Sequence, residues 1–139
     1  MKFVYSSAPQ EIKDLADEYL GQGELKRLMS ARRDFFIVLK LDQGVVVGFV
    51  VYSKDKDRGF LDAVVIRQEY ILDSWQLKSV LSKSIKGLLN LGCKSVLYSP
   101  CETLPENPLN EITPKLLVHS FGFHVLQESA SDNGWIFRA

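Results

Sequence analysis

The chain has 139 residues, of which 46% are hydrophobic and 24% charged, as in an ordinary folded domain. Its 17 basic residues balance its 17 acidic ones, so no overall field attracts nucleic acid or an anionic membrane. The first residues lack a signal-peptide core, and no apolar run approaches the roughly 18 residues of a membrane helix. We therefore expect one cytoplasmic domain spanning residues 1–139.

The first half of the chain predicts a strand, two helices and an antiparallel meander. Apolar residues recur at three- and four-residue spacing before Gly21, which indicates a helix with one buried face. Two β-branched runs flank Asp42 to Gly44, and Gly44 can adopt the positive φ of a hairpin turn. A charged turn, 54–59, leads to the next strand. The predicted elements are a strand at 3–5, helices at 7–20 and 24–32, and strands at 35–41, 45–52 and 60–67.

The segment 60–98 is the most informative part of the sequence. An apolar strand at 60–67 is followed by a loop, an amphipathic helix at 74–91, Gly92 and a second strand at 95–98. This arrangement implies two parallel strands joined by a right-handed crossover. The helix then begins at the carboxyl end of the first strand, where α/β folds usually bind anions and cofactors.

The remaining elements complete a mixed α/β sheet. Three prolines predict a loop from Ser99 to Glu111. Thr113 and Pro114 have the pattern of an N-cap followed by proline, which predicts a short helix that Gly122 ends. Strands at 123–126 and 135–138 would form a last hairpin. The predicted order is β-α-α-β-β-β-α-β-α-β-β, with strands four and five parallel.

This order, together with Ser120-Phe-Gly-Phe123, resembles the GNAT superfamily of acyl-CoA-dependent N-acetyltransferases. The resemblance implies a GNAT-like fold and transfer of an acetyl or similar group from acetyl-CoA to a small-molecule or peptide amine. The resemblance does not decide whether the protein forms an oligomer. The family's pyrophosphate loop usually reads Gln/Arg-x-x-Gly-x-Gly/Ala. The local counterpart, residues 73–78, reads Asp-Ser-Trp-Gln-Leu-Lys and lacks both glycines, so this chain would be a divergent member.

The resemblance also implies a cofactor site along the fourth strand and the following helix. The strand's backbone would bind the pantetheine arm, and the start of the helix would bind the pyrophosphate. The implied residues are Val65, Ile66, Arg67, Gln76, Leu77, Lys78 and Ser79. Asp73 and Gln76 also match a capping box. The Asp73 carboxylate would then accept hydrogen bonds from the first backbone amides of the helix, the same amides that would bind the pyrophosphate. If Ser74 is the cap instead, Asp73 can point away.

Candidate catalytic residues follow from a departure from the family pattern. The family's general-acid tyrosine, four residues before the glycine of Gly-Phe, corresponds to Val118, which cannot donate a proton. Tyr98 and His119 are the alternative donors, although His119 can equally be an exposed or capping residue. Asp62 interrupts an apolar strand and is the candidate base for the amine, unless it lies on a wet face.

Other functions have weaker support in the sequence. Cys93 and Cys101, with His119 and His124, match no metal-ligand spacing, so we expect no metal and free thiols. Loop carboxylates such as Glu69 can attract a cationic substrate. The main alternative to an enzyme is a catalytically inactive GNAT-like domain that acts as a binding or regulatory module. A third hypothesis is an unrelated α/β binding domain.

Overall fold

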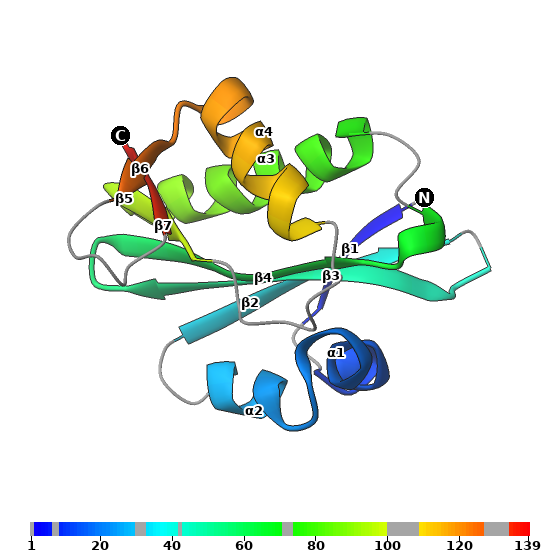
Figure 1. The fold of residues 1–139 in the computed structure, drawn as a ribbon. Coiled ribbons are helices and arrows are strands. Elements are labelled where there is room, and N and C mark those ends of the chain that lie inside the picture. Colours follow the sequence, from blue (N-terminus) through cyan, green and yellow to red (C-terminus); the bar gives the residue numbers. More distant parts are fainter. Residues whose placement is uncertain are drawn as a thin grey trace.

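The computed structural model describes residues 2–6, 9–29, 33–41, 43–70, 74–99, 109–126 and 134–139. Within these residues a seven-stranded sheet in the order β1-β2-β3-β4-β5-β7-β6 forms the middle layer. Helices α1 and α2 cover one face, and α3 and α4 cover the other (Figure 1). The elements are β1 (Lys2–Ser6), α1 (Lys13–Leu20), α2 (Glu24–Met29), β2 (Arg33–Lys40), β3 (Val46–Asp55), β4 (Arg58–Ile66), α3 (Ser74–Asn90), β5 (Ser95–Tyr98), α4 (Leu109–Phe121), β6 (His124–Leu126) and β7 (Gly134–Arg138).

The strand pairing confirms the predicted mixed sheet. Strands β1 to β4 pair antiparallel with their neighbours, β4 pairs parallel with β5, and β7 pairs antiparallel with both β5 and β6. The parallel pair requires the crossover through α3, which is the segment that the hydrophobic pattern had predicted. The element order is the expected one, with two short 3₁₀ turns (Pro9–Ile12 and Gln68–Tyr70) added.

Two apolar cores lie on the two faces of the sheet. One joins strand residues such as Val64 and Ile66 to the inner faces of α3 and α4, and the other joins Val65 and Ala63 to α1 and α2. Successive side chains of β4 thus enter opposite cores, as strand geometry requires. Consequently residues 63–66 of β4 are buried on both faces, which explains their continuous apolar run.

Helix α3 has the predicted apolar stripe. The buried residues of that stripe are Leu77, Val80, Leu81, Ile85 and Leu88, while Lys78, Lys83 and Lys86 are exposed. Ser84 is buried as well, and its hydroxyl donates to the Val80 carbonyl oxygen at 2.9 Å. At the other end, the Lys54 ammonium donates to the Leu91 carbonyl oxygen at 2.6 Å, which places a cation against the helix C-terminus.

Two of the predicted boundaries are clearly wrong. Helix α4 begins at Leu109, so Pro114 lies inside it and residues 109–111 are not loop. The sequence contains two proline signals for the start of this helix, Pro108 just before Leu109 and Pro114 just after Thr113. Glu111, an acidic residue in the first turn, favours the earlier start. The predicted turn at 54–59 is also shorter, since β3 and β4 extend toward each other until only Lys56, at a φ of 57°, and Asp57 separate them. The predicted helix at 24–32 is observed as α2 over Glu24–Met29, and the rest of its predicted span, 30–32, lies outside the described residues.

Candidate active site at the β4–β5 gap

Strands β4 and β5 separate halfway along β4. Their parallel pairing runs from Arg58 with Ser95 to Leu61 with Tyr98, and β5 ends there. Strand β4 continues to Ile66, paired with β3 on its other side. Among the described residues, no strand pairs with the β5-facing edge of residues 62–66. Within the described part of the chain, the backbone groups along that edge therefore have no strand partner.

A β-bulge marks the point of separation. Tyr52 of β3 pairs with Leu61, but the next residue, Val51, pairs with Ala63, so Asp62 is the extra residue in β4. Bulges bend a strand, redirect its side chains and are common beside active sites. Asp62 is half-buried, and its Oδ2 atom has no exposed surface.

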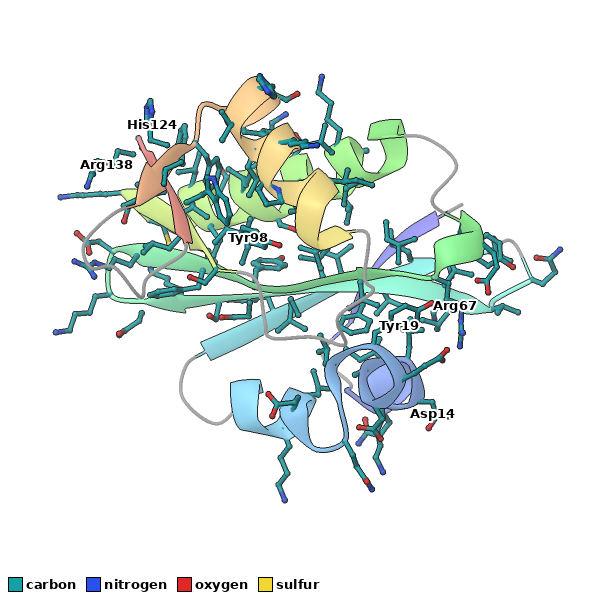
Figure 2. All side chains as sticks on the ribbon, in the orientation of Figure 1. Asp14, Tyr19, Arg67, Tyr98, His124 and Arg138 are labelled. Atoms are coloured by element: carbon teal, nitrogen blue, oxygen red, sulfur yellow. The ribbon has the colours of Figure 1, made fainter. Side chains whose placement is uncertain are left out.

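The structure brings two of the three predicted catalytic residues to this point. Tyr98 pairs with the neighbour of Asp62, is 4% exposed and lies between the sheet and the α3–α4 layer (Figure 2). Its ring centroid is 5.9 Å from that of Trp135. His119 is exposed in the last turn of α4, beside Val118, which is 38% exposed.

The backbone of β4 alternates between its neighbour β3 and the gap. The Arg67 amide donates to the Val47 carbonyl oxygen at 2.8 Å, and the Val65 carbonyl oxygen lies against Gly48. Because antiparallel pairing uses every second residue on one side, the backbone groups of Val64 and Ile66 point away from β3 and toward the gap. Of the three strand residues predicted to bind a cofactor, Ile66 is the one whose backbone has this orientation.

The side chain of Arg67 is directed to the α1 layer. Its Nη1 atom lies 3.1 Å from Oε2 of Glu18, and Figure 2 shows it on the side of the sheet that carries α1. Both groups are partly exposed. This guanidinium is therefore paired with a carboxylate and is not directed to the start of α3.

A basic hollow of about 480 Å³ lies against α3 and the end of α4. Lys78 and Ser79, both predicted cofactor residues, contribute to it, whereas Leu77 is buried in the core and the Gln76 side chain lies outside the described part. The remaining lining residues, which sequence reasoning assigned no role, are Ser82, Lys83, Lys86 and Phe121. Their spacing of four along α3 (78, 82, 86 and 79, 83) is the signal that could have grouped them.

Other predicted residues contribute less to this site. Cys93 is buried, and its burial raises the pKa of the thiol, opposed by the nearby Lys54 ammonium. Asp73 and Cys101 lie outside the described residues. Within the described part of the chain, no three His, Cys, Asp or Glu residues group as metal ligands would. None of the helices described here is long and apolar enough to cross a membrane.

Comparison with known proteins identifies the fold. No protein-family model matches the chain, and no curated protein sequence matches it. Among solved structures, PaiA N-acetyltransferase from Thermoplasma acidophilum with coenzyme A matches 100% of both chains at 14% identity and a TM-score of 0.67. The GNAT family N-acetyltransferase YhbS from Escherichia coli with CoA matches 99% of this chain and 80% of its own at 13% identity and a TM-score of 0.69. A chain of the NatC complex bound to Gag peptide and CoA matches 100% and 99% at 16% identity and a TM-score of 0.63.

The protein therefore has the fold of the GNAT N-acetyltransferases, as the order of its elements predicted. Sequence identity to the matched structures is low, so it is a divergent example of that fold.

Proposed function

We propose that this protein is an N-acyltransferase that transfers an acetyl or similar group directly from acyl-CoA to a small-molecule or peptide amine. The observation that carries the proposal is the β4–β5 gap, where a buried strand with an open backbone edge meets Asp62 and Tyr98. Several proteins of the same fold were solved with CoA.

The pantetheine arm would lie along β4 as an added strand. Its amides would bond the backbone of Ile66 and Val64, which point into the gap. Backbone hydrogen bonds of this kind do not depend on side-chain identity, so the divergent sequence is compatible with them. Val65 would contribute indirectly, because its backbone pairs with β3 and its side chain packs in the α1–α2 core. Arg67 would end the strand where the arm meets the start of α3.

The anionic end of the cofactor would bind at α3. The first four amides of a helix have no partner within it, and the helix dipole favours an anion there. These amides belong to residues 74–77, which include two of the predicted cofactor residues, Gln76 and Leu77. The adenosine phosphate would lie in the adjoining hollow of about 480 Å³, whose three lysines would supply positive charge beside a loop that lacks the family's glycines.

The chemistry needs a neutral amine and a stabilised thiolate. We assign Asp62 as the base that accepts the amine proton as nitrogen attacks the thioester carbon and the carbon–sulfur bond breaks. Tyr98 would donate a proton to the departing sulfur, with His119 as the alternative donor. Because a thiol titrates near pH 8.5, thiolate is a tolerable leaving group even without a tyrosine at position 118.

Calorimetric titration with acetyl-CoA tests the cofactor assignment, and thiol release with a panel of amines tests catalysis. At a hundredfold excess over Kd, binding should stabilise the fold by about 2.7 kcal/mol. Lys78→Ala should weaken CoA but not dephospho-CoA, while Lys94→Ala, an exposed lysine outside the hollow, should change neither. Absence of acetyl-CoA binding would refute the proposal.

A second candidate function is a GNAT-like module without catalysis. Val118 favours it, because the position of the usual acid holds an aliphatic side chain. Such a module would bind CoA without releasing thiol with any amine of the panel, or would not bind CoA at all.

A further inference from the structure

Two buried hydroxyls lack a hydrogen-bond partner among the described residues. Both Thr113 and Ser53 are 0% exposed, and neither Oγ1 of Thr113 nor Oγ of Ser53 is bonded. Ser84 is equally buried, yet it donates to the carbonyl oxygen one turn earlier. Buried polar groups are nearly always bonded, since desolvation without a bond is unfavourable, so each exception needs an explanation.

Thr113 belongs to the face of α4 that covers the β4–β5 gap. Leu117, one turn later on the same stripe of the helix, is fully buried and shares a core with Val64, Ile66 and Tyr98. Helix α4 packs against β4, and Figure 1 shows its first turns, in yellow, above that strand. Thr113 therefore lies on the buried side of α4, the side that packs toward β4.

We propose that the Thr113 hydroxyl is a binding group for the pantetheine arm. It would donate to an amide carbonyl oxygen of the arm when the arm enters between β4 and α4. This inference rests on the proposed function, because it assumes that the gap receives an acyl-CoA. A carbonyl oxygen has two lone pairs, so one that accepts from the backbone of β4 can accept a second bond, and Thr113 offers an unused donor on the α4 side.

Thr113→Val provides a test, because it keeps the shape and removes the hydroxyl. Without ligand the variant should melt higher than the wild type, by about 2–5 °C, since an unbonded buried group is gone. Its Kd for CoA should nevertheless rise about three- to tenfold, because one hydrogen bond to the arm is lost. A purely structural threonine would give a lower melting temperature or an unchanged Kd.

Ser53→Ala is the matched control. Ser53 has the same buried, unbonded hydroxyl but pairs with Asp34 and Phe60, and it follows Val51 on the α1–α2 face of the sheet. This variant should leave the affinity for CoA unchanged. A second control uses adenosine 3′,5′-bisphosphate, which lacks the pantetheine arm and should bind wild type and Thr113→Val equally.

The outcomes separate this inference from the proposed function. If wild type does not bind CoA, the proposed function fails and the role of Thr113 fails with it. If wild type and Thr113→Val bind CoA equally, only the role of Thr113 is refuted. The same holds if Thr113→Val loses as much affinity for the bisphosphate as for CoA. If Thr113→Val does not fold, Thr113→Ser and Thr113→Ala are compared. The Ser variant should bind CoA more tightly than the Ala variant, and equal binding would overturn the inference.

Discussion

The substitution Gly48→Ala tests how closely β3 approaches β4, the strand that borders the candidate site. A Cβ atom at this position would lie 2.6 Å from the Val65 carbonyl oxygen, 3.0 Å from Cδ1 of Leu39 and 3.1 Å from Cγ1 of Ile66. The nearest of these atoms belongs to the backbone, so it cannot rotate away. In Gly48→Ala the strand β4 must therefore move at residues 65 and 66.

The expected loss of stability follows from two opposing effects. Overpacking a filled core costs about 1–3 kcal/mol. Replacing glycine by alanine inside a strand stabilises the fold by about 0.5–1 kcal/mol, because the unfolded chain loses conformational freedom. The net loss for Gly48→Ala is roughly 1–2 kcal/mol. At about 3–5 °C per kcal/mol for a domain of this length, the melting temperature should fall by about 3–10 °C.

Thermal and urea unfolding measure this loss, and CoA titration measures its effect on the site. Gly87→Ala is the control, since a Cβ there would meet Oη of Tyr52 at an ordinary 3.6 Å inside α3. That variant should gain about 0.5–1 kcal/mol from helix propensity. Wild-type stability in Gly48→Ala, or equal losses in both variants, would refute the reasoning.

Three further predictions concern single side chains. Val118→Tyr should raise turnover, by up to about 10²–10⁴-fold if the added hydroxyl protonates the sulfur; unchanged turnover in steady-state assays would contradict this. In a Cys101→Ser background, Cys93 should react with iodoacetamide far more slowly folded than unfolded, because burial raises its thiol pKa. The raised pKa stabilises the fold fully below the ordinary thiol range and progressively less as pH rises through the folded value, so stability should fall at alkaline pH. Glu18→Gln removes a partly exposed ion pair with Arg67 and should cost under about 1 kcal/mol in urea unfolding, less in high salt; a loss above about 2 kcal/mol would contradict an exposed pair.

The sequence by itself determined the elements and their order. The spacing of Leu77, Val80 and Leu88 requires a helix with one buried face, and the apolar runs on either side require buried strands. A helix between two such strands implies a parallel pair, so the mixed sheet and its crossover followed from local patterns alone. Gly44, at a φ of 88°, forms the predicted hairpin for the same local reason.

The tertiary structure decided what depends on pairing between distant segments. Thr113 with Pro114 and Pro108 with Leu109 are comparable starts for α4, and local signals did not separate them. The bulge at Asp62 is a property of register against β3, so sequence could nominate the aspartate but not place it where β4 and β5 separate. The burial of Thr113 depends on α4 docking over β4. Periodicity and capping act within a few residues, whereas register, bulges and the walls of a site arise from contacts between residues far apart in the chain.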